Sequence, residues 1–167
     1  EISECLVGSE MCIRDSCYTI QALGLRVWRR RRQKSDAGYR IEGGNSMEER
    51  EQLQREVLKE LITYSDNLIP ALQILIEELR TEGQEDTNTF LNDVINGINW
   101  EIEVFNQCMS LINEKGSYID KKSMINAVKN LGNSLSGGDT LMVADCLETD
   151  FLPFLNRLDL AAKQVVE

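Results

Sequence analysis

The chain has 167 residues, of which 42% are apolar and 28% charged, and its formal net charge at pH 7 is −10. This length suits one globular domain. A surface of that charge repels phosphate, so we expect no nucleic acid as a partner. The chain has no histidine, which excludes Ser-His and Cys-His catalysis. It also has no apolar run of the ~18 residues that a membrane span needs, so we expect no membrane insertion.

The first 46 residues differ from the rest of the chain in charge. Residues 17–46 have seven Lys or Arg against two Asp or Glu, whereas residues 47–167 have ten against twenty-two. In addition, Glu42-Gly43-Gly44 can be encoded by a bacterial ribosome-binding sequence at the usual distance before Met47. We therefore expect the native protein to begin at Met47 and residues 1–46 to be a non-native, disordered extension.

The start of this extension has a specific resemblance. Leu6 to Ser16, LVGSEMCIRDS, resembles a translated transposase-type sequencing adapter, and residues 1–5 fit the same source. The resemblance covers residues 1–16 and implies a DNA-library artefact. The alternative for residues 17–46 is functional, because the run Trp28-Arg29-Arg30-Arg31-Arg32 is typical of an arm that binds nucleic acid or membrane.

The first helix is predicted over residues 48–82, and Pro70 lies inside it. Because proline removes a backbone donor and crowds the carbonyl of Asp66, we expect a kink or a brief break there. Gly83 can end the helix in a left-handed conformation. The apolar stripe consists of Leu53, Val57, Leu61, Tyr64, Leu68, Leu72, Leu75 and Leu79.

The second helix, capped by Asp86 or Thr87 and ending near Asn113, has two apolar lines. The main seam follows a heptad-like spacing that favours a buried face: Leu91, Ile95, Ile98, Ile102, Phe105, Met109 and Ile112. The other line lies on a different side of the helix: Gly97, Trp100, Val104, Cys108 and Leu111. We interpret Gly97, Trp100, Val104 and Leu111 as a groove for a protein partner, with Trp100 as its anchor. The alternative is that the first helix covers this line.

Two further helices complete the domain. The third is predicted over residues 121–135, with Asp120 as its cap and Gly137-Gly138 at its end. Its apolar face is Met124, Val128, Leu131 and Leu135. The fourth, over residues 140–166, is capped by Asp139 and contains Pro153. Because such short connections force antiparallel neighbours, residues 47–167 are predicted to form an all-α, up-down-up-down four-helix bundle.

Carboxylates are the remaining candidates for chemistry. The clusters are Glu77-Glu78, Glu82-Glu85-Asp86 and Asp145-Glu148-Asp150. No calcium-binding loop and no glycine-rich phosphate loop is present, so we interpret these clusters as solvated helix faces and predict no metal and no cofactor. A carboxylate-based metal site or enzyme at Asp145, Glu148 or Asp150 is the alternative. Cys108 and Cys146 lie in apolar patterns and are predicted to be buried, reduced thiols, which suits the cytoplasm.

In size, charge and helical content, residues 47–167 resemble small acidic all-helical bacterial proteins and are similar to flagellar and secretion chaperones. The resemblance concerns architecture and no motif, and it implies a protein that shields an apolar partner segment. We therefore expect a non-enzymatic, cytoplasmic protein-binding module, chaperone- or adaptor-like, that uses apolar surface on its first two helices to bind an amphipathic helix. Self-association into a homo-oligomeric bundle is the alternative.

Overall fold

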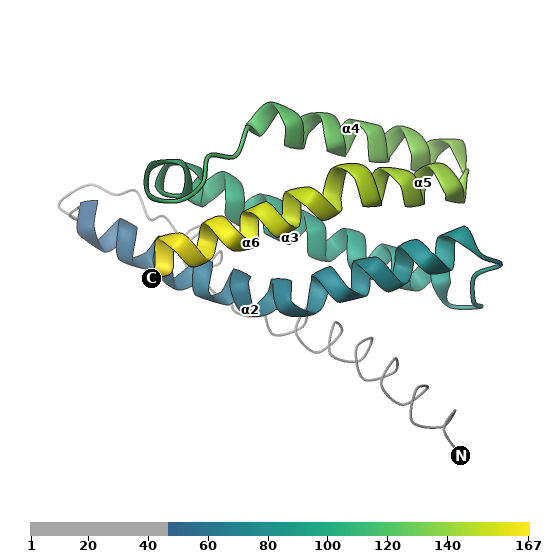
Figure 1. Ribbon diagram of the computed structural model, residues 1–167, viewed down its shortest axis with the longest axis horizontal. Coiled ribbons are helices and arrows are strands. Elements are labelled where there is room, and N and C mark those ends of the chain that lie inside the picture. The colour runs from purple at the N-terminus through teal and green to yellow at the C-terminus, as the bar shows by residue number, and fades with distance from the viewer. Residues whose placement is uncertain (1–46) are drawn as a thin grey trace, which may run out of the picture.

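The computed structural model describes residues 47–167, and they form an all-α fold, as predicted. The helices are α2 (Met47–Arg80), α3 (Thr87–Lys115), α4 (Lys121–Gly137), α5 (Thr140–Cys146) and α6 (Leu152–Val166), and a π-helical segment, η1 (Leu147–Phe151), joins α5 to α6. Figure 1 shows rods that run in alternating directions, with α5, η1 and α6 as the fourth rod. The extension predicted at residues 1–46 lies outside the described residues.

Side-chain and glycine caps set several of the helix ends, whereas Asp86, one of the two caps predicted for α3, stands at its N-cap position without a side-chain cap hydrogen bond. The Asp120 carboxylate accepts hydrogen bonds from the backbone N–H groups of Lys122 and Ser123, as expected of an N-terminal cap. Gly138 ends α4 in the left-handed conformation, with φ of 69°, and Gly83 adopts the same φ after α2. These caps confirm the predicted boundaries to within about two residues, the usual uncertainty of a helix end.

Helix α2 runs through Pro70 without a break. Figure 1 shows α2 bent along its length, which suits the lost backbone donor and the crowded carbonyl of Asp66. The neighbouring Leu68, Ala71 and Leu72 are almost completely buried. Their packing holds the helix together across the proline, so of the two predicted responses, a kink or a brief break, α2 shows a bend and no break.

The sequence predicts one regular α-helix for the fourth rod, but η1 interrupts it. The backbone N–H of Leu152 donates to the carbonyl of Leu147, five residues earlier. Pro153 follows directly and has no N–H, and its ring would crowd the carbonyl of Thr149 in a regular α-helix. A π turn is wider than an α turn, so it accommodates the proline without ending the rod.

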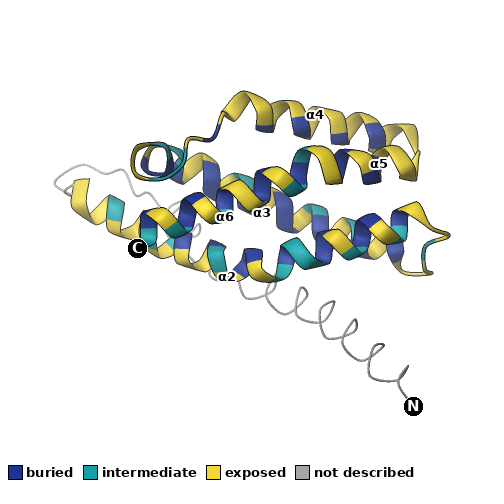
Figure 2. Ribbon diagram, in the orientation of Figure 1, coloured by how far each residue is buried: buried dark blue, intermediate teal, exposed yellow. Residues whose placement is uncertain are grey.

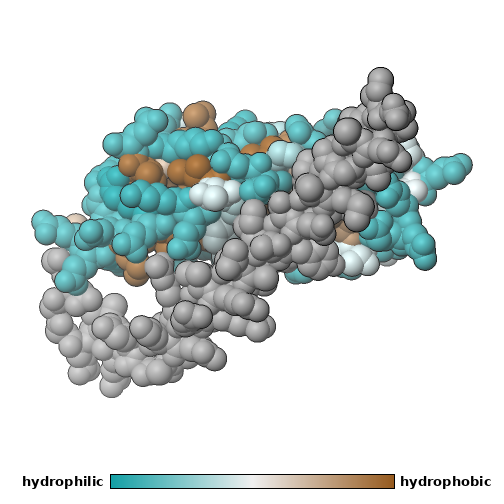
Figure 3. Space-filling model, turned by 90° about the horizontal axis from the view of Figure 1, so that it is seen from below, coloured by the Kyte–Doolittle hydropathy of each residue, from teal (hydrophilic) through white to brown (hydrophobic). Residues whose placement is uncertain are grey.

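Three rods make the core, and α4 lies outside them. Helix α2 packs against α3, α5 and α6, and α3 packs against α6, whereas α4 packs mainly against α5 and η1. In Figure 1, α4 lies beside α5 and on the far side of the molecule from α2. Figure 2 shows the buried residues on the facing sides of the rods. Figure 3 shows the molecule from below, where the described residues that can be seen are mainly hydrophilic with a few apolar patches among them.

The apolar face of α4 is therefore rotated from the predicted one. Met124 and Leu131 are buried as predicted, but their buried companions are Ala127 and Ser134. Val128 and Leu135, which were predicted to be core, are 43% and 39% exposed. The physical reason is that α4 is seated against only one rod, so only one narrow side of it is covered.

Two leucines on α6 test this description of the core. Leu155 is fully buried, whereas Leu160 is 54% exposed. We expect Leu155→Ala to lower the free energy of unfolding by about 2–5 kcal/mol, because it removes buried contacts and leaves a cavity. The matched Leu160→Ala should change it by no more than about 0.5 kcal/mol. Urea unfolding followed by circular dichroism measures both, and equal effects would contradict the assignment of the core.

Candidate functional site

Helix α2 covers the line of α3 that was predicted to form a partner groove. A Cβ atom added at Gly97 would lie 2.5 Å from the hydroxyl oxygen of Tyr64 and 2.8 Å from Cδ1 of Leu68. Glycine is therefore required at this position because two side chains of α2 occupy the space next to the α3 backbone. The floor of the predicted groove is filled from within the domain.

The other three groove residues are core residues as well. The Trp100 ring packs edge-on against Tyr64, with ring centroids 4.9 Å apart, and both side chains are buried. Val104 and Leu111 are also buried. The structure thus closes the groove predicted at Gly97, Trp100, Val104 and Leu111: Gly97 and Trp100 contact α2, and Val104 and Leu111 are buried in the core. This is the alternative that the sequence left open.

A buried acid lies beside this contact. Glu101, on α3, is fully buried, and the hydroxyl of Ser65 on α2 donates to its Oε1 at 2.8 Å. Its other oxygen, Oε2, has no hydrogen-bond partner among the described residues, and the same holds for the buried Oδ1 of Asp159 on α6. The second oxygen of Asp159 accepts from the ammonium group of Lys163 at 2.7 Å. Three helices therefore contribute polar groups around Glu101, of which Ser65 and Glu101 are buried and Asp159 is partly buried.

Burial sets the protonation state of Glu101. Removal from water raises its pKa from 4.5 to about 8; the Ser65 hydroxyl opposes this shift, and the nearby negative charge of Asp159 adds to it. Glu101 is thus mainly a neutral carboxylic acid at pH 7. In that form its Oε2 bears a proton and can donate a hydrogen bond, which lowers the cost of leaving it in the core.

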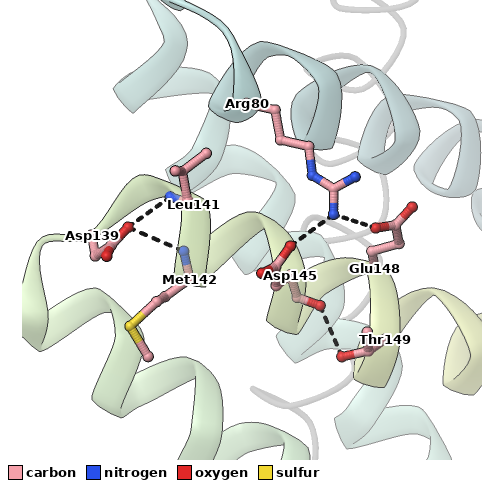
Figure 4. Close-up of polar contacts among 7 residues, drawn as sticks. All are labelled: Arg80, Asp139, Leu141, Met142, Asp145, Glu148 and Thr149. Carbon is pink, nitrogen blue, oxygen red and sulfur yellow. Dashed lines mark hydrogen bonds and ion pairs between the residues drawn. The ribbon is translucent and has the colours of Figure 1, made fainter.

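Two acids of the cluster on the fourth rod form ion pairs with one arginine. The Arg80 guanidinium donates to Asp145 at 2.8 Å and also to Glu148, as Figure 4 shows. The third member, Asp150, accepts from the side-chain amide of Asn130 at 3.0 Å. Among residues 47–167, no group of three or more His, Cys, Asp or Glu is placed to hold a metal ion. The three acids thus have protein partners.

Cys108 and Cys146 are buried, free thiols, as predicted, and burial raises the pKa of each to about 11. The Cys146 thiol lies 3.6 Å from a carboxylate oxygen of Asp150 and 3.9 Å from the carbonyl oxygen of Ala127. Such thiols stay protonated at neutral pH and are poor nucleophiles. They are structural in this fold.

A pocket of about 170 Å³ lies where α4 meets η1 and α6, and we call it the π-turn pocket. Its apolar lining consists of Ile119, Met124, Ala127, Pro153 and Phe154. Its polar lining consists of Ser123, Thr149, Asp150 and Arg157. Because π turns are frequently found at functional sites, this pocket is the second candidate site of the domain.

Neither Glu101 nor the π-turn pocket was found from the sequence. Glu101 follows Trp100 directly and lies between the two apolar lines of α3, so its position on the helix was a signal that the side chain is buried. The pocket depends on the π turn, for which Pro153 was the visible cause. Its lining comes from two helices and a turn, which no local pattern joins.

Two glycines in mid-helix test the close contact of α2 and α3. Gly97→Ala should lower the free energy of unfolding by about 1–3 kcal/mol, because the new methyl group overlaps Tyr64 and Leu68. Gly132→Ala should raise it by about 0.5–1 kcal/mol, because nothing lies within 4 Å and alanine is the better helix former. Urea unfolding measures both. Stabilisation by Gly97→Ala would contradict the contact.

The pKa of Glu101 predicts how stability depends on pH. Between pH 4.5 and about 8, the folded protein holds a proton that the unfolded chain has released. The contribution of Glu101 to stability should therefore fall with rising pH, by up to about 1.4 kcal/mol per pH unit, and level off above pH 8.

The matched variants isolate this contribution. Glu101→Gln should remove it, because the amide has no proton to lose, whereas Glu103→Gln, at an exposed site on the same helix, should retain it. Urea unfolding at a series of pH values gives the difference between the two variants. Identical pH dependence in both would contradict a neutral Glu101.

Among residues 47–167, no helix combines the length and the apolar character that a membrane span requires.

The comparisons with known proteins give a family and no activity. The chain has no match among the curated proteins or the solved structures. A family model described as a domain of unknown function, DUF8042, matches residues 56–160, which include Glu101 and every residue of the π-turn pocket. Because the match covers more than half of the chain, the protein belongs to the DUF8042 family.

Proposed function

We propose that residues 47–167 form a non-enzymatic protein-binding module, of chaperone or adaptor type, whose binding face is centred on α4. One observation carries this proposal. Ile125, Val128 and Leu135 lie along one side of α4 and are 40%, 43% and 39% exposed. Apolar residues that recur on one side of a helix normally face a neighbour. Here no other helix of the domain fully covers them, and exposed apolar groups that gather on one side of an element are typical of interaction sites.

Further features of the domain support a binding role. A partly buried apolar row remains on α3: Leu91, Ile95, Ile102 and Met109. An amphipathic helix is the partner that suits such rows, because it presents apolar side chains at the same spacing. The ion pairs of Arg80 with Asp145 and Glu148 favour a structural role for these acids over a catalytic one. The buried, protonated thiols suit the reducing cytoplasm.

A second copy of the chain is the alternative occupant of this face. It would make the protein a homo-oligomeric bundle and would use the same exposed row. The two occupants differ in the mass of the complex, since the chain itself is 19.0 kDa.

Site-specific photocrosslinking in cells tests the proposal. The photoreactive residue benzoylphenylalanine is placed at Val128, on α4, or at the exposed Lys59, on α2, as the matched control. We expect Val128 to yield a discrete crosslinked protein, because it lies in the apolar row, and Lys59 to yield none. Ile125→Lys, which puts a charge in the same row, should abolish the product.

The outcome is measured by electrophoresis and mass spectrometry. A product of twice the mass of the chain would assign the face to a second copy. No product at Val128, or one that Ile125→Lys leaves unchanged, would contradict a binding face on α4.

A further inference from the structure

The volume of the π-turn pocket decides what class of group it can hold. Sites for whole small molecules usually enclose about 300–1,000 Å³. At about 170 Å³, the pocket is smaller than these sites, but it is comparable to a cavity of about 150 Å³ that accepts benzene. It therefore has room for a single aromatic or branched aliphatic side chain.

One part of the lining suits an apolar group inside the pocket. Met124 comes from α4, and Pro153 and Phe154 come from α6. Methionine is flexible and polarizable, so its side chain can adapt to inserted groups of different shape. Phe154 is anchored from behind, because its ring packs edge-on against Phe105 of α3 at 5.8 Å. The pocket thus has one adaptable wall and one fixed wall.

The two charged residues that line the pocket differ in whether they already have partners. Asp150 already accepts hydrogen bonds from Asn130 and from the Cys146 thiol. Arg157 is exposed and has no ion pair with any described residue. The charged group that is available to a partner is therefore a cation.

The helix beside the pocket has the same sign of charge. From Lys121 to Gly137, α4 has three lysines and no acidic residue, although acids outnumber bases in residues 47–167. Lys121 and Lys122 lie in the first turn of α4, where a positive charge is unfavourable to the helix dipole. Helix stability therefore does not account for their position, and two cations there would attract an acidic partner.

We propose that the π-turn pocket receives one aromatic or branched aliphatic side chain of a protein partner, and that Arg157 pairs with a carboxylate next to that side chain. The inference rests on the proposed function and specifies the chemistry of the partner. An acidic, amphipathic peptide segment meets both requirements. Its apolar side chain fills the pocket, and its carboxylate lies against Arg157 at the rim.

Peptide selection tests this chemistry. The purified full chain is used to select from a phage-displayed library of short random peptides. We expect the enriched peptides to combine an aromatic or branched aliphatic residue with a nearby Asp or Glu. The affinity of the best synthetic peptide should fall about tenfold for Thr149→Phe, which fills the pocket, and for Arg157→Glu, which reverses the rim charge.

Each variant has a matched control. Thr63 is exposed, and its hydroxyl donates to the carbonyl four residues earlier, as that of Thr149 does, so Thr63→Phe controls for added surface. Arg50, exposed on α2, gives Arg50→Glu as the control for net charge. Both controls should bind the peptide like the parent protein. All variants share the basic residues 17–46, so a loss confined to the pocket variants cannot come from that segment.

The outcomes separate this inference from the proposed function. Unchanged helical circular dichroism and urea midpoints show that the pocket variants are folded. Enrichment of no peptide, enrichment of peptides without acids, or equal binding by pocket and control variants would each overturn the pocket assignment. If Val128 still crosslinks to a partner in those cases, the binding face on α4 stands without the pocket.

Discussion

The close contact of α2 and α3 at Gly97 is the constraint on which the rest of the arrangement depends. Without a side chain at this position, Tyr64 and Leu68 lie against the backbone of α3, and Trp100 packs edge-on against Tyr64. The next residue on each helix, Ser65 and Glu101, then come within hydrogen-bond distance. Helix α6 covers another side of α3 through the contact of Phe105 with Phe154, so α3 packs against two rods. Helix α4 packs mainly against α5 and η1 instead.

Local structure could be predicted from the sequence because it depends on few residues. The caps at Asp120 and Asp139 form as predicted, and Gly138 ends α4 in the left-handed conformation. A cap is decided within one turn of helix, so the sequence contains the whole signal. The all-α class follows equally from periodicity. The roles of the two lines on α3 could not be assigned, because both are apolar and only the position of α2 distinguishes them.

The candidate sites could not be predicted from the sequence, because they depend on contacts between distant segments and on the response of the backbone to a proline. Glutamate is usually found at the surface, and the burial of Glu101 results from a contact with α2, whose Ser65 lies 36 residues away in sequence. The π-turn pocket requires the hydrogen bond from Leu152 to Leu147, which replaces the regular α-helical pattern before Pro153. A sequence pattern records the proline but not which of several responses the backbone will adopt.

The one-sided seating of α4 has a consequence for how the domain opens. The contacts of α4 are mainly with α5 and η1, which follow it directly in the chain. A segment held by few and local contacts can detach while the remaining core stays intact, as a cooperative unit of its own. A ligand that bridges α4 and α6 would then act on this partial opening. It would stabilise the state in which α4 stays packed against α5 and η1, while global unfolding of α2, α3 and α6 remained a separate event.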